Sequence, residues 1–333
     1  MKIIAHRVGN KINGESLTLS QEELQLEEGM AELLENYFLG SFKSEETFHF
    51  YSDSYLVNNP VYNSVSKIFE SPIFSFSHQA ENIAQHLYDS AENPRVQGGE
   101  LFIVYFEGEE PEQNKIGLFK TEKRESFLKF SFNDDCLEVE KDHGVSLSKI
   151  DKAALIHNTG KETGFVLEVV DNNKNGDMYY WFEDFLKVKQ REDDYFHTEE
   201  SLMIFKNFIT KQLPQEFEVS KVDQVNFLNK SINFFKEKDH FELSEFTSEV
   251  LEDTAVIESF EAFKTDYEQD MQVNVSEEFE INSTAVKKMQ RHFKSVIKLD
   301  KNFQIHIHGD QKLLEQGENE KGKFYQLYFE KQQ

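Results

Sequence analysis

Six cations gather near the C-terminal end of the chain, at a spacing suited to binding phosphate groups. With Asp300 as the single acid among them, they give residues 287–301, here called the basic segment, a local charge of +5 in a chain of −26. At about 100° per residue, four of the six would share one helical face within about 60°, opposite an apolar face. The six cations are Lys287, Lys288, Arg291, Lys294, Lys298 and Lys301.

The basic segment is therefore expected to form an amphipathic helix, with Ser283 or Thr284 as its N-cap. A helix that presents several cations together suits a phosphate backbone, which it would bind without reading base sequence. Two other interpretations stay open. The lysines could balance nearby acids on a solvated face, or the helix could lie on an anionic lipid surface.

Two histidines follow the basic segment in a strand-like stretch. His306 and His308 alternate with Ile305 and Ile307, so the two imidazoles would point to one side of a strand. Two ligands do not complete a metal site, and no local carboxylate or cysteine pattern adds a third. We expect the histidines to be cross-strand neighbours of residues 323–331, where protonation below about pH 6.5 would add positive charge.

The stretch DNNKNGD partly matches a calcium-binding loop. Its residues at the first, third, fifth and sixth loop positions are Asp171, Asn173, Asn175 and Gly176. The twelfth position, which should be a bidentate glutamate, is Phe182. A polar turn leaving a strand explains the same residues. We expect no metal and no cofactor, with calcium at residues 171–177 left as an open alternative.

No motif of a known catalytic class is present: the chain lacks GxGxxG, GxxxxGK[ST], HExxH and GxSxG. We therefore expect no enzymatic activity. A metal-dependent nuclease built on LEVVD and EDFLKVK is a weaker alternative, because the spacing of its acids and lysines is unusual. A helix-turn-helix reader in residues 241–270 is excluded on charge, since that block holds ten acids and one lysine, Lys264.

Composition indicates a folded protein of two domains. Hydrophobic residues make up 38% of the 333 residues and include 32 Phe, enough for a sizeable core despite 62 acids. No apolar run approaches the roughly 18 residues of a membrane span, and the N-terminus does not read as a signal peptide. The lone Cys136 agrees with a reducing compartment. These features predict a cytoplasmic protein with no membrane partner.

The pattern of elements predicts an α+β fold. After a strand at 2–8 come N-terminal helices, the first running from Ser20 as its N-cap to Gly40. Short β-rich runs between residues 99 and 171 then predict one mainly antiparallel sheet. A mainly helical region follows and ends in the basic helix and a strand pair. We place the domains at 1–213 and 214–333.

Several stretches in the same order resemble a known family. They are VQGGELFIVYF, LSKIDKAALIHN, YYWFEDFLKVKQREDDYFHTEESLMIFKNFI, the block from LPQEFEV to TSEVL, and FKSVIKLDKNFQIHIHGD. Together they are similar to the bacterial nucleoid-associated proteins of the NdpA-like family, from about residue 95 to the end and more weakly at KIIAHRVGNK.

The resemblance implies a protein at the nucleoid that binds double-stranded DNA with little sequence preference. It carries over no catalytic and no DNA-contact residues, so the assignment of the basic segment rests on charge alone. A second hypothesis is an acidic interaction protein that docks on a DNA-processing enzyme or another nucleoid protein. The sequence leaves a homo-oligomer open.

Overall fold

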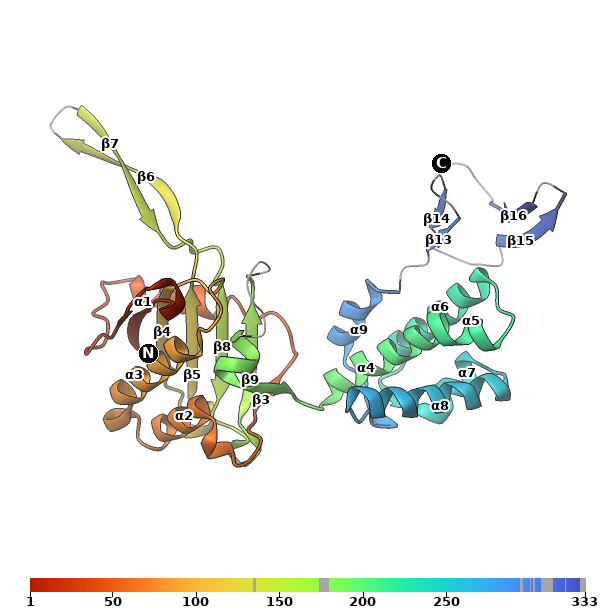
Figure 1. The fold of residues 1–333 in the computed structure, drawn as a ribbon, viewed down its shortest axis with the longest axis horizontal. Coiled ribbons are helices and arrows are strands. Elements are labelled where there is room, and N and C mark those ends of the chain that lie inside the picture. The colour runs from red at the N-terminus through yellow and green to blue at the C-terminus, as the bar shows by residue number, and fades with distance from the viewer. Residues whose placement is uncertain are drawn as a thin grey trace. The chain divides into compact units, whose positions relative to one another are not determined.

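The chain divides into two compact units, Met1–Arg191 and Glu192–Gln333 (Figure 1). The computed structural model describes residues 1–133, 136–173, 180–293, 296–299, 301, 303–306, 314–320 and 322–329. The division lies earlier than the expected boundary at 213/214, because the helix that follows Arg191 packs on helices of the second unit. Within the described residues, no helix combines the length and the apolar character needed to cross a membrane.

The first unit is built on an eight-stranded antiparallel sheet, in the order β10-β3-β9-β8-β5-β4-β1-β2. The expected α+β class with a mainly antiparallel sheet is confirmed. The strands of this sheet are β1 (Lys2–Val8), β2 (Leu17–Thr18), β3 (Phe48–Phe50), β4 (Gly99–Phe106), β5 (Lys115–Thr121), β8 (Lys152–His157), β9 (Val166–Asp171) and β10 (Val188–Gln190).

Helices cover both faces of the sheet, because its central strands are apolar on both sides. One face packs against α2 (Pro60–Glu70), α3 (Pro72–Ser90) and the π-helix η5 (Tyr180–Leu186). The other packs against α1 (Met30–Leu39), where the ring of Phe38 stacks on that of Phe119 with centroids 4.3 Å apart. Short 3-10 helices are η1 (Lys11–Asn13), η2 (Leu56–Asn58), η3 (Pro111–Gln113) and η4 (Lys161–Thr163).

The first helix is shorter than expected at its N-terminal end. It ends before Gly40 as predicted, but it begins at Met30, after Gly29 in a left-handed conformation. Ser20 does not cap it. Instead the Ser20 N–H donates to Nδ1 of His6, and the Leu24 N–H donates to the Ile3 carbonyl at 2.8 Å. These two bonds, one to a side chain and one to the backbone of β1, hold the segment beside β1 in place of helical bonds.

Two predicted strands lie outside the sheet. The sequence predicted one sheet, but β6 (Glu125–Asn133) and β7 (Cys136–Gly144) pair with each other as a separate two-stranded hairpin (Figure 1). β5 pairs directly with β8, so the hairpin is an excursion between two neighbouring strands. Residues 125–132 and 136–143 of this hairpin are exposed. We call residues 125–144 the arm.

The second unit is mainly helical, as expected, and its core is rich in phenylalanine. The chain stays helical through Pro214, which occupies the first turn of a short helix, a position where its missing N–H costs little. Its helices are α4 (Asp194–Asn207), the π-helix η6 (Phe208–Gln212), α5 (Leu213–Glu216), α6 (Lys221–Glu237), α7 (Leu243–Val250), α8 (Thr254–Met271) and α9 (Ser283–Gln290).

Three two-stranded ladders complete the described part of the second unit. They include the expected strand pair near the C-terminus. The ladders are β11 (His240–Glu242) with β12 (Glu278–Glu280), β13 (Val296–Lys298) with β14 (Gln304–His306), and β15 (Leu314–Asn319) with β16 (Gly322–Leu327).

Candidate nucleic-acid interface

The basic segment begins on α9, a two-turn helix anchored in the core of the second unit. Its N-cap is Asn282, whose side chain accepts hydrogen bonds from the N–H groups of Thr284 and Ala285. The buried side of α9 contributes Val286 and Met289 to the phenylalanine-rich core, and the helix packs on α4 and α6. This anchoring fixes the direction in which the first cations point.

The first cations differ in their surroundings. Lys287 and Arg291, one helical turn apart, are exposed, and no ion pair is recorded for either within the described residues. Lys288 instead places its Nζ 2.9 Å from Oε1 of Glu199 on α4 and over the ring of Tyr195. Part of the basic segment therefore balances an acid of the fold, and part faces solvent.

The expected single helix through the basic segment is wrong. α9 ends at Gln290, and residues 296–298 form β13, so Lys298 is a strand residue. Ile297 pairs with Ile305 and packs with Val225 of α6. This contact buries Ile297, and a β-branched residue fits such a position on a strand.

The remaining cations of the basic segment are described to different extents. Lys301 is exposed in the connection between β13 and β14, and no ion pair is recorded for it within the described residues. For Lys298 the structure describes the backbone, which pairs with Gln304. Lys294 lies outside the described residues. Exposed side chains can thus be assigned to Lys287, Arg291 and Lys301.

The histidine prediction is also corrected. β14, with His306, pairs with β13 and not with the strand at 322–327. That strand pairs with β15, joined to it by a short turn in which Asn319 faces Gly322. The sequence LEQGEN of β15 has little apolar character, so its pairing was not foreseen. His308 lies outside the described residues, and those residues hold no group of three or more His, Cys, Asp or Glu side chains able to bind a metal.

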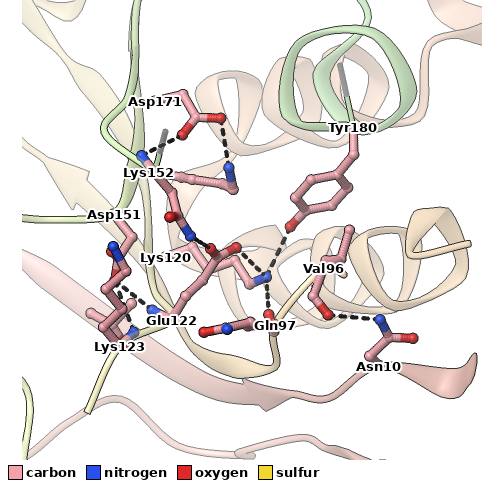
Figure 2. Close-up of polar contacts among 12 residues, drawn as sticks. Asn10, Val96, Gln97, Lys120, Glu122, Lys123, Asp151, Lys152, Asp171 and Tyr180 are labelled. Atoms are coloured by element: carbon pink, nitrogen blue, oxygen red, sulfur yellow. Dashed lines mark hydrogen bonds and ion pairs between the residues drawn. The ribbon is translucent and has the colours of Figure 1, made fainter. Parts of the chain in front are cut away.

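The first unit also holds a buried ionic cluster that the sequence did not predict (Figure 2). Lys120 of β5 places Nζ 2.9 Å from Glu122 Oε1, and Lys152 of β8 places Nζ 2.6 Å from Asp171 Oδ2. These four side chains are at most 2% exposed. Two ion pairs thus lie close together among the strands.

Tyr180 joins the two pairs. Lys120 Nζ lies 2.9 Å from its hydroxyl oxygen, and both ammonium groups, of Lys120 and Lys152, sit 5.2 and 5.3 Å from its ring centroid (Figure 2). Burial lowers the pKa of Lys120, although Glu122 opposes the change, and burial raises the pKa of Tyr180 well above its usual value.

A further carboxylate fixes the loop after β5. Asp151 accepts hydrogen bonds from the N–H groups of Glu122 and Lys123 at 2.7 and 3.1 Å (Figure 2). The Lys120 ammonium also donates to the Gln97 carbonyl at 2.7 Å. The polar atoms of the cluster are therefore engaged with one another, an arrangement that stabilises the strand ends.

Two residues of the proposed calcium loop, Asp171 and Asn173, belong to this buried cluster. Asp171 pairs with Lys152, and the Asn173 side-chain amide donates to Glu122 at 2.7 Å, so both residues point into the cluster. Asn175 and Gly176 lie outside the described residues.

The nuclease alternative included Lys189, from the segment EDFLKVK. Its Nζ lies 4.5 Å from the ring centroid of Tyr51.

The fold and the candidate site define a class of protein: an α+β protein with an antiparallel-sheet unit, a helical unit and a local cationic surface in an acidic chain. The family model described as nucleoid-associated protein YejK matches residues 4–324, and the chain belongs to this family. The expected resemblance is confirmed. Comparisons with curated proteins and with solved structures found no match.

Proposed function

We propose that this protein is a non-catalytic nucleoid protein that binds double-stranded DNA with little sequence preference, through phosphate contacts of the basic segment. Membership of the nucleoid-associated family supports a role at the nucleoid, in the cytoplasm. The observation that carries the DNA contact is the exposure of Lys287 and Arg291, one turn apart on a helix anchored in the core. The same positive charge continues along the chain, through the exposed Lys301 and, in the sequence, through Lys294 and Lys298.

The geometry suits backbone contacts better than base reading. α9 has only eight residues, and its buried side is occupied by the core, so a short exposed edge is left for DNA. Lysine and arginine on such an edge neutralise phosphates and release counterions. Lys288 is excluded from the principal contacts because Glu199 holds its ammonium. The chain charge of −26 limits the affinity, because it repels a polyanion, while the salt dependence of binding comes from the counterions released at each phosphate contact.

The test is a titration of a fluorescent duplex of about 30 base pairs over a range of salt concentrations. The variant Lys287→Glu/Arg291→Glu should bind at least about ten-fold more weakly, and the slope of log K against log salt should flatten by about two. The matched control is Lys211→Glu/Lys236→Glu, which makes the same charge change at exposed lysines elsewhere in the second unit. Equal weakening in both variants would reject the assigned surface, and an unbound parent at low salt would reject direct DNA binding.

A second candidate function is docking on a basic protein such as a DNA-processing enzyme, and the surface of α8 favours it. A pocket of about 560 Å³ there combines acids with apolar side chains. Asp266 and Asp270 line it beside Phe263 and Met271, and the Met271 side chain is 58% exposed. A lysine- or arginine-rich segment with an apolar residue would complement such a pocket.

Nuclease treatment of a cell lysate distinguishes docking on a protein from binding to DNA. A partner that docks on α8 should be recovered from a nuclease-treated lysate by the parent and lost with Asp266→Lys/Asp270→Lys. The same variant should keep the DNA affinity of the parent or improve it, because it adds positive charge. Recovery that depends on intact DNA would count against docking.

A further inference from the structure

The arm is an amphipathic hairpin whose apolar face is uncovered. Residues opposite each other on paired strands point to the same side, so the register Phe130↔Val139 and Phe132↔Leu137 gathers these four on one face, with Leu128 next to them. The exposed fractions are 61% for Leu128, 59% for Phe130, 79% for Phe132, 54% for Leu137 and 57% for Val139.

The charges of the arm are divided between its two faces. Acidic side chains lie on the opposite face, where Glu138, Glu140 and Asp142 stand across from Ser131, Lys129 and Phe127. The apolar face holds no acid among its described positions, and its one permanent charge is Lys141, opposite Leu128.

The exposed apolar face of the arm indicates that it binds a partner molecule. A two-stranded hairpin alone is marginally stable in water, and this one leaves five large apolar side chains in solvent. Contiguous apolar patches of several hundred Å² on a protein surface mark interaction sites. The acids on the opposite face disfavour nucleic acid and anionic lipid as that partner, because both carry phosphates.

We propose that the apolar face of the arm packs against the same face of a second copy of this chain. Two molecules of charge −26 repel each other over most of their surfaces, and this face lets them meet without bringing acids together. A two-fold arrangement matches apolar rows to apolar rows and turns both acidic faces to water.

The area agrees with such a contact. Five side chains that each expose more than half of their surface amount to about 500 Å² per copy, from roughly 150–250 Å² for a large buried side chain. A pair therefore buries about 1,000 Å² of apolar surface, just below the roughly 1,200 Å² of standard specific interfaces and in the range of weaker, reversible ones. Ser126, Lys141 and His143, on the same face towards the base of the arm, supply the rim.

Sedimentation equilibrium of the full chain between about 1 and 100 µM tests the proposal. The parent should be dimeric. The variant Phe130→Lys/Phe132→Lys should raise the dimer dissociation constant by about 100-fold or more, because two central apolar side chains are lost. Lysine is chosen because it lowers the negative charge of the chain, so weaker association could not be attributed to added repulsion.

The matched control places the same two lysines on the acidic face, as Phe127→Lys/Ser131→Lys, where Asp142 and Glu138 stand opposite. This variant should dimerise like the parent. A monomeric parent overturns the proposal, and so does a parent dimer that both variants keep or both lose. The proposal does not rest on DNA binding, and the measurement contains no DNA.

Discussion

The ammonium of Lys288 lies 2.9 Å from the Glu199 carboxylate of α4, while the neighbouring residue Lys287, in the same helical turn, is exposed. Consecutive lysines of one basic segment therefore have different surroundings. Lys288 joins α9 to α4 within the second unit, and the Lys287 side chain is exposed to solvent. The proposed DNA contact can be tested by separating these two roles.

Single substitutions of Lys288 and Lys287 should change different properties, stability for Lys288 and DNA binding for Lys287. Lys288→Met should lower the free energy of unfolding of the second unit by about 1 kcal/mol, a value discounted for the 41% exposure of the Lys288 side chain, and should leave the salt slope of DNA binding unchanged. Lys287→Met should leave stability unchanged and flatten the slope by about one. Calorimetry and duplex titration measure the two quantities. Loss of both properties in both variants would contradict the division of roles.

The buried cluster predicts a non-additive loss of stability. Lys120→Met leaves the Glu122 carboxylate buried without its cation and should cost about 3–5 kcal/mol. Adding Glu122→Gln to it should recover part of that loss, because no unpaired charge then remains. Urea unfolding followed by the fluorescence of Trp181, the single tryptophan, reports on the first unit. Lys115→Met, on the same strand but only partly buried, is the control, and equal costs for both lysines would contradict the cluster's role.

The burial of His6 predicts that the first unit loses stability in mild acid. The His6 side chain is buried and its Nδ1 accepts the N–H of Ser20 at 3.0 Å, which requires an unprotonated Nδ1. Burial lowers its pKa below the 6.5 of an exposed histidine, so the unfolded chain takes up the proton first. Stability from this group is complete above pH 6.5 and is lost as the pH falls towards the folded-state pKa.

The same unfolding assay, repeated between about pH 5 and 7.5, measures this dependence. His6→Asn keeps an acceptor near the Nδ1 position and cannot titrate, so it should lower stability at pH 7.5 but flatten the pH dependence. His78→Asn, at an exposed position of α3, should leave the dependence as in the parent. A parent curve that is flat below pH 6.5 would be inconsistent with a buried neutral His6.

The backbone at Gly164, between β3 and the start of β9, requires a glycine. Its φ of +95° is one that glycine adopts readily, and an added Cβ would lie 2.3 Å from the Phe50 carbonyl oxygen. Gly164→Ala should therefore cost more than about 2 kcal/mol and loosen β3. Gly14→Ala shares a positive φ, but its Cβ would meet nothing within 4 Å, so it should cost about 1 kcal/mol. Similar unfolding midpoints for the two variants would refute the steric part of this prediction.

Local patterns in the sequence were sufficient for much of the fold. The strands at 99–106 and 115–121, and α6 to α8, follow from alternation and helical periodicity. The C-terminal half of the basic segment was misread because its cations fit a helical face, whereas the pairing of Ile297 with Ile305 decides the structure there. That pairing is a tertiary contact, which a helical wheel does not contain.

The surroundings of the candidate site residues were predicted less completely than the fold. Lys287 and Arg291 lie on an exposed surface, as their charge suggested, but the partner of Lys288 comes from 89 residues earlier in the chain. The cluster of Lys120, Lys152 and Tyr180 was missed for the same reason, since the sheet brings together residues that no local motif connects. A lysine within an otherwise apolar strand was the available signal.

The arm enters and leaves the sheet between two strands that are already neighbours. Lys120 of β5 stands opposite Lys152 of β8, so a tight turn could join these strands and leave the ladder between them intact. The connectivity of the first unit is therefore independent of the length of the arm. The arm, residues 125–144, can therefore lengthen, shorten or change during evolution while the pairing of β5 with β8 stays as it is, and the surface proposed for self-association can vary with it.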